Sequence, residues 1–300
     1  MGFNKKIFIT DWLMFAYIIF TIVWILIGWE NIAEIAKVSP LGLLIKICGI
    51  SSLIIFLLIL NHFTKNPIIQ FLRFWYPIFL LEFFYITTTY VHFMFFPEII
   101  DPFFQYLDEM IFGYQPSMVW GTSYDEFFYQ EFFHFAYFSY YLMIFGIPFY
   151  IYIKKEKKEF IRALFNIMFV FLTCYVMFMI LPVVGGRAVE GMRELIETYR
   201  HGLFTHIMVF IYKSAEHWGA AFPSSHVAVA LTITLVSFRH FKLFGLLLLV
   251  NTFFLSWSTV FCHYHYFVDV ISGVLFGLIM FFISEVIYAI FGAKKEKYIE

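Results

Sequence analysis

Charged residues are scarce in this sequence, and that scarcity excludes an ordinary soluble domain. Asp, Glu, Lys and Arg make up 14% of the 300 residues, while hydrophobic types reach 62% and aromatic types 24%. Soluble domains are typically about 25% charged and about 45–50% apolar. The apolar runs are long and uniform, which argues against a β-barrel of alternating segments of about 10 residues. We therefore predict an all-α, polytopic transmembrane helix bundle.

Cysteine is also rare, and the three that occur fall in or beside apolar segments, so no disulfide framework is implied. No small-residue cleavage site follows the first apolar run, which we interpret as a membrane span rather than a removed signal peptide. Long internal repeats and low-complexity linkers are absent from the sequence as well. We expect one membrane domain over residues 1–300, with two extra spans in 1–73 and a six-span core in 74–291.

Stretches of about 20 apolar residues predict about eight spans. The sixth is the shortest, and we expect it to begin slightly below the membrane surface. The spans are placed near residues 11–29, 41–61, 74–96, 132–153, 160–181, 224–239, 243–262 and 266–291.

The distribution of basic residues predicts the orientation of these spans. With alternating loops, 14 of the 20 Lys and Arg fall on one side, among them Arg73, Lys154 and Arg239. We therefore expect an integral protein of the plasma membrane, with both termini cytoplasmic and the long loops 97–131 and 182–223 outside.

The outer loop 97–131 contains seven acids and no Lys or Arg. Its aromatic residues suggest a helix lying at the membrane interface. Two interpretations stay open, a solvated outer loop and a cover over a site. In the other long loop, residues 190–200 form an amphipathic pattern typical of a surface helix, and Gly185 and Gly186 permit close backbone approach.

Two polar clusters on this outer side are separated by two spans, so the chain returns to the face that it left. His265 and Asp269 are spaced i, i+4, which places them on one helix face. The carboxylate can orient the histidine and leave its other ring nitrogen free as a nucleophile. Taken alone, such a pair is more often a helix cap.

The other cluster begins at Pro223. Ser224 and Ser225 start a helix, where free backbone N–H groups favour a phosphate, although such a turn is also an ordinary helix start. His226 follows and can give a proton to a leaving oxygen. Arg187 adds a permanent charge suited to phosphate oxygens. Together these residues predict phosphoryl transfer through a phosphohistidine, with His265 as the nucleophile.

The stretch Phe222-Pro223-Ser224-Ser225-His226 resembles the second motif of the type 2 phosphatidic acid phosphatase superfamily. Ser258 with His265 and Asp269 resembles its third motif. The resemblance implies catalytic roles for His265, His226 and Asp269, and phosphate binding by Arg187, Ser224 and Ser225. It also implies lipid phosphate or diphosphate substrates and no metal or other cofactor; we expect membrane lipids and no nucleic acid as partners.

The chain departs from the family pattern at three positions. Thr259 stands where the third motif has Arg, and Ile180 and Ala188 replace the Lys and Pro of the first motif. The pattern around Gly185-Gly186-Arg187 and His265-Tyr266 is similar to the inositol phosphorylceramide synthase-like branch. The groups that could replace the missing charges are Lys213, His217 and His263, of which His263 reads mainly as a rim residue.

Hydrolysis of a lipid phosphate is the leading function, and transfer to an alcohol acceptor is the alternative. A metal hydrolase using His263, His265, Asp269 and His226 as ligands is a lower alternative. A transporter is another, motivated by Glu82 near the middle of the third span. An acid there must face the bundle interior or a cavity, as a substrate contact or as a partner of a neighbouring span.

Overall fold

The structure is a computed structural model that describes residues 7–189, 202–214 and 217–292. Among these, seven helices are long and apolar enough to cross a membrane, which confirms a polytopic helical bundle. They are α1 (Ile9–Ile27), α3 (Pro40–Phe63), α4 with α5 (Pro67–Phe79 and Leu81–Val91), α8 (Phe127–Lys154), α9 (Lys157–Ile180), α13 (Lys242–Phe261), and α14 (Phe267–Ile287) with its extension Tyr288–Gly292.

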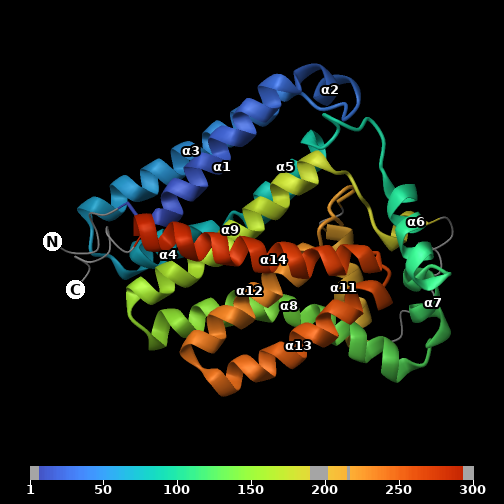
Figure 1. Cartoon of the computed structure of the whole chain (residues 1–300). Helices are drawn as coiled ribbons and strands as arrows, with labels where there is room; N and C mark the ends of the chain where they lie inside the picture. The colour runs from blue at the N-terminus through green and yellow to red at the C-terminus, as the bar shows by residue number, and fades with distance from the viewer. Residues whose placement is uncertain (1–6, 190–201, 215–216, 293–300) are drawn as a thin grey trace.

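The sixth predicted span is α12 (Ser225–His240), a helix of 16 residues. It packs against α8, α9, α13 and α14, and Val227, Ala230 and Ile233 are fully buried. A helix surrounded by other helices need not span the hydrocarbon by itself, so its short length is compatible with its central position. Figure 1 shows α12 inside the bundle, behind α14.

Small residues let α14 approach α12 closely at the end where both helices begin. A Cβ built on Gly277 would lie 2.8 Å from the Ala228 Cα, and one on Gly273 would lie 2.7 Å from the Ser224 carbonyl oxygen. Glycines four residues apart commonly form such contacts between membrane helices. This contact places the start of α14 beside the start of α12.

The third span begins earlier than predicted and is broken in the middle. It starts after Asn66, whose side chain accepts hydrogen bonds from two backbone N–H groups, and it breaks at Leu80 between α4 and α5. Pro77 lies one turn before the break, where a proline disturbs the helical hydrogen bonds. The expected loop position of Arg73 was wrong, because Arg73 lies within α4 and is 3% exposed.

Two ionic clusters, one buried and one partly exposed, join the helices at the end opposite the connections 97–131 and 182–223. Asp11 of α1 pairs with Arg73, accepts a hydrogen bond from the Tyr76 hydroxyl at 2.7 Å, and accepts another from the Phe8 amide. Glu285 of α14 pairs with Arg162 of α9 and Arg239 of α12. These clusters fix α1 to α4, and α14 to α9 and α12.

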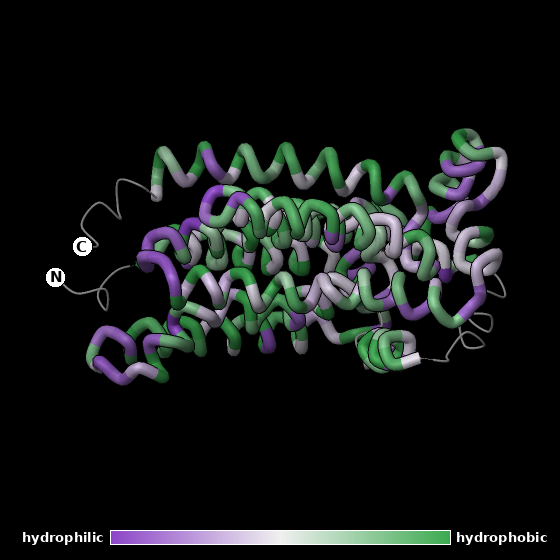
Figure 2. Tube along the Cα trace, turned by 90° about the horizontal axis from the view of Figure 1, so that it is seen from below, coloured by the Kyte–Doolittle hydropathy of each residue, from purple (hydrophilic) through white to green (hydrophobic). Residues whose placement is uncertain are grey.

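The predicted interfacial helix in the loop 97–131 is present as two short helices, α6 (Asp101–Phe112) and α7 (Pro116–Ser123). They lie with α11 (Leu203–Ser214) at the end of the bundle opposite the start of α1 (Figure 1). Another short helix, α2 (Trp29–Glu34), follows α1. Hydrophobic residues predominate along the middle of the bundle and hydrophilic ones near its two ends (Figure 2). The predicted surface helix at 190–200 falls outside the described residues.

Removing one member of the Asp11–Arg73 pair should destabilise the protein strongly. Asp11→Ala removes the Asp11 carboxylate from a buried guanidinium, and removal of one partner of a buried ion pair typically costs about 3–5 kcal/mol. The double variant Asp11→Leu/Arg73→Met removes both charges and should recover much of the loss. Thermal unfolding of the detergent-solubilised protein measures both effects, with Lys46→Ala on the exposed face of α3 as the control. An Asp11→Ala variant as stable as that control would contradict the expectation.

Candidate active site

The two predicted histidines meet at the ends of separate helices. His226 lies in the first turn of α12, and His265 lies in the turn between α13 and α14. The His265 Nε2 is 3.4 Å from the His226 Nδ1 and 3.3 Å from the Ser224 hydroxyl oxygen. The polypeptide therefore makes the predicted round trip and brings the two imidazoles into contact.

Backbone hydrogen bonds form the turn that holds His265. The amides of Tyr264 and His265 both donate to the Thr259 carbonyl at 3.0 Å, at the end of α13. Thr259 replaces the arginine of the family motif, and here its carbonyl anchors the turn. Gly185, with φ +93, lies so close that an added Cβ would be 2.1 Å from the Tyr264 carbonyl oxygen. The predicted close approach of Gly185 is thus confirmed.

Asp269 contacts His265 and also caps helix α14. Its Oδ2 lies 3.4 Å from the His265 Nδ1, with both side chains almost fully buried. The same oxygen accepts a hydrogen bond from the Tyr266 amide at 2.8 Å, so the carboxylate also caps α14. The cap and the orienting contact are therefore compatible, because one carboxylate at the third position of the helix makes both.

His265 is neutral over the usual pH range. Burial first, and then the positive charge of Arg187, lowers the pKa of His265 to about 3. A neutral imidazole with a proton on Nδ1 has a free electron pair on Nε2, the atom that faces His226. His265 is only 2% exposed, whereas His226 is partly accessible.

Two tyrosines that the sequence analysis did not identify extend this network. The Tyr137 hydroxyl of α8 lies 2.8 Å from the His226 Nε2 and also contacts the Tyr212 hydroxyl of α11. The Tyr212 ring stacks on Tyr264, with centroids 3.9 Å apart. These contacts join residues far apart in the sequence, so no local pattern indicated them. They fix the orientation of His226 from the side opposite His265.

Arg187 lies at this end of the bundle, and one of its hydrogen-bond donors is unused within the described part of the chain. Its Nη2 donates to the His217 carbonyl at 2.9 Å, and its guanidinium lies 4.9 Å from the centre of the Tyr212 ring. The buried Nε has no hydrogen-bond partner among the described residues. The His217 Nε2 lies 2.6 Å from the Thr88 hydroxyl, so His217 supports Arg187 instead of facing the two catalytic candidates.

The other two candidates for the missing charges also differ from expectation. His263 is 4% exposed, and its Nδ1 lies within hydrogen-bonding range of the Ser117 carbonyl of α7. The expected rim position was therefore wrong, because His263 is buried in the contact between α7 and the turn. Lys213 is exposed near the end of α11. Within the described ranges, no group of three or more His, Cys, Asp or Glu is arranged to hold a metal ion.

Acids of the connection 97–131 hold the loops of the site. Asp101 accepts hydrogen bonds from the amides of Val184 and Gly185 and from the Tyr266 hydroxyl. Asp108 accepts from the amides of Phe267 and Val268, at 2.8 and 3.0 Å, and so caps α14. Both are buried, and burial raises the pKa of each while the backbone N–H groups oppose the rise. At these two positions the solvated interpretation was wrong.

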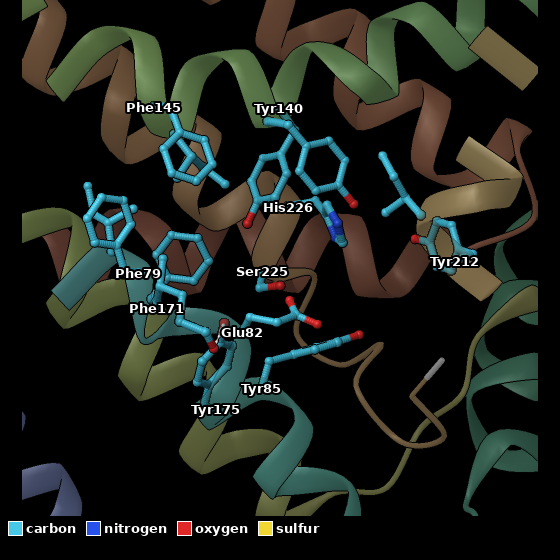
Figure 3. A pocket seen from close by; sticks show the side chains of 15 residues that line it. Phe79, Glu82, Tyr85, Tyr140, Phe145, Phe171, Tyr175, Tyr212, Ser225 and His226 are labelled. Carbon is cyan, nitrogen blue, oxygen red and sulfur yellow. Dashed lines mark hydrogen bonds between the residues drawn. The ribbon is translucent and has the colours of Figure 1, made fainter. Parts of the chain in front are cut away.

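Ser224 and Ser225 begin α12 as predicted, with Ser224 as the N-cap. The Ser224 amide already donates to the Asp269 carbonyl at 3.1 Å, so only its hydroxyl faces His265. A cavity of about 310 Å³ lies beside Ser225 and His226. Figure 3 shows their side chains at one part of it, with Glu82 near the middle and Phe79, Phe145 and Phe171 farther along.

The fold and the site define an integral membrane protein with a paired-histidine centre at one end of its helices. The chain matches the PAP2 superfamily over residues 107–283, more than half of its length, and it belongs to that superfamily. Membership supports a phosphatase-type enzyme that acts on lipid phosphates. Searches of curated proteins and of solved structures gave no match. The matched range begins in α6, so α1 to α5 lie outside it.

Removal of the Asp108 cap should weaken the start of α14. Asp108→Ala leaves the amides of Phe267 and Val268 without their acceptor, and loss of such a cap costs about 0.5–2 kcal/mol. Asp125→Ala, which removes an exposed acid from the same connection, is the matched control. Thermal unfolding compares the two; equal stability of the two variants would show that the Asp108 contacts contribute little.

Acidification should destabilise the protein partly through His265. An unfolded histidine has a pKa of about 6.5, whereas folding lowers the pKa of His265 to about 3. Between these values the unfolded chain binds the additional proton, so stability falls as the pH drops from about 6.5 towards 3. In unfolding measurements across this range, His265→Gln should reduce the slope relative to the wild type, with Lys46→Ala on the exposed face of α3 as the control for handling. Parallel curves for His265→Gln and wild type would contradict the pKa assignment.

Proposed function

We propose that this protein is a lipid-phosphate phosphatase that works through a phosphohistidine on the extracytoplasmic face. The observation that carries the proposal is the contact between His265 Nε2 and His226 Nδ1, beside the Ser224 hydroxyl. These two nitrogens face each other. A phosphorus centre bound between the two rings would have His265 as nucleophile on one side and His226 as proton donor on the other. The unpartnered Nε of Arg187 supports an anionic ligand at this end.

In the first step the His265 Nε2 attacks phosphorus, and the bond from phosphorus to the lipid oxygen breaks. Protonated His226 gives its Nδ1 proton to that oxygen, so the lipid leaves as an alcohol. Asp269 stabilises the positive charge that develops on the His265 ring. Arg187, the Ser224 hydroxyl and the start of α12 at Ser225 bind the phosphoryl oxygens.

In the second step water attacks the phosphohistidine, and His226 accepts the proton of the water. The bond between nitrogen and phosphorus breaks, and inorganic phosphate is released. Phosphorus cannot fit between two nitrogens 3.4 Å apart, so the proposal requires the imidazoles to separate when substrate binds. His226, which is partly accessible, is the ring that moves, and this movement breaks its contact with the Tyr137 hydroxyl. His265 stays held by the Thr259 carbonyl and Asp269.

The basic residues support this orientation of the protein. Lys154, Lys155, Lys157 and Lys158 lie at the junction of α8 and α9, at the opposite end of the bundle from the two histidines. The excess of Lys and Arg at that end favours the cytoplasm. We therefore place the site on the outer side, and at a plasma membrane.

The decisive experiment replaces the nucleophile. His265→Ala should lower phosphate release from lipid phosphates such as phosphatidic acid by at least about a thousandfold, because no covalent intermediate can form. His226→Ala should lower it less when the leaving group is p-nitrophenolate, which needs no proton. His62→Gln is the control for handling in detergent. Full activity of a correctly folded His265→Ala enzyme would refute the proposal.

Transfer to an alcohol is the second candidate, and the cavity beside His226 favours it because an acceptor could bind there. The resemblance of the Gly185-Gly186-Arg187 segment to the inositol phosphorylceramide synthase-like branch points the same way. Supplying long-chain alcohols or inositol together with a lipid donor separates the two functions. A new phosphodiester or phosphomonoester detected by mass spectrometry indicates transfer, whereas free phosphate alone indicates hydrolysis.

A further inference from the structure

The cavity beside His226 leads from the candidate active site to the lipid-facing surface of the bundle. Its lining comes from α4, α5, α8, α9, α11 and α12. Phe79 and Phe145 both line it and are 48% and 47% exposed, so it opens sideways between α4 and α8. At about 310 Å³ it falls within the range of about 300–1,000 Å³ typical of small-molecule sites. A molecule in the membrane could therefore reach His226 without crossing water.

Glu82 is the one carboxylate that lines this cavity among the described residues. It lies in the first turn of α5, just after the break at Leu80. Its carboxylate points into the cavity (Figure 3). Within the part of the chain that the structure describes, the Glu82 carboxylate has no hydrogen bond or ion pair with another side chain or with the backbone. Glu82 is exposed at the cavity, whose lining also includes Tyr85 and Tyr141. A carboxylate that faces membrane hydrocarbon is costly unless a donor satisfies it.

The chemistry of the lining restricts what can bind. Phe79, Phe145 and Phe171 suit a hydrocarbon chain. A phosphate would be repelled by Glu82, so it belongs at the other side of His226, near Arg187. The group that contacts Glu82 must instead donate a hydrogen bond, as a hydroxyl or an ammonium does.

We propose that the cavity binds the chain of a lipid phosphate that carries a hydroxyl or ammonium group close to the phosphate, and that Glu82 selects it. This inference rests on the proposed function, because it takes the phosphate to bind at His265. Glu82 lies outside the range that matches the superfamily, 107–283. The selecting residue is therefore on a segment separate from the paired histidines.

Three single-chain substrates of equal length test the proposal: hexadecyl phosphate, 2-hydroxyhexadecyl phosphate and 2-aminohexadecyl phosphate. For the purified full-length enzyme, kcat/KM should be about tenfold or more higher for the two substrates with a donor group, as expected for one hydrogen bond to a charged group. Glu82→Leu should bring the three values together while hexadecyl phosphate is still turned over. Glu82→Gln should keep the preference for the hydroxyl and lose that for the ammonium. Glu98→Leu, at an exposed acid after α5, is the matched control.

The same ratios in wild type and Glu82→Leu would overturn the selection by Glu82. Absence of phosphate release from all three substrates by the wild type would instead count against the proposed function. Binding to the cavity can then still be measured without turnover. The ligand 2-aminohexadecan-1-ol, which has no phosphate, should raise the Tm of the wild type more than that of Glu82→Leu. Equal Tm shifts in the two proteins would also overturn the inference.

Discussion

The close packing of α12 on α14 is the constraint on which the rest of the site depends. Gly273 and Gly277 leave no space for a side chain against Ser224 and Ala228. The Ser224 amide donates to the Asp269 carbonyl at the same place. Because the two helices touch at their first turns, the residues just before and within those turns are brought together. His226 and His265 face each other as a consequence of backbone contact and not of their own attraction.

Around this contact, polar side chains fix loops that have no regular structure of their own. Asp101 holds the segment that leads to Arg187, and Asp108 holds the start of α14. Tyr137 and Tyr212 restrain His226 from the other side. The connection 97–131 is therefore part of the framework of the site, and Asp101 and Asp108 are its buried acceptors for backbone N–H groups that would otherwise be unpaired.

Much of this arrangement could be predicted from the sequence, because local sequence patterns indicate it. Apolar runs of sufficient length indicate the spans, and the spacing of His265 and Asp269 indicates a shared helix face. Contacts between distant residues leave no such pattern. Arg73 was assigned to a loop because a charge beside an apolar run usually marks its end, and its partner Asp11 is 62 positions earlier. The roles of Tyr137, Tyr212 and Asp108 depend on packing between helices in the same way.

The break of the third span at Leu80 has a consequence for how this protein could diversify. The proposed reacting groups belong to α12, α14 and the turn before α14, whereas the cavity wall around Glu82 belongs to α4 and α5. If the proposed roles hold, mutations in that wall alter which lipid is accepted without changing the contacts of the two imidazoles. Exchanging residues 67–91 between homologues would then transfer substrate preference, with the chemical step inherited from the recipient.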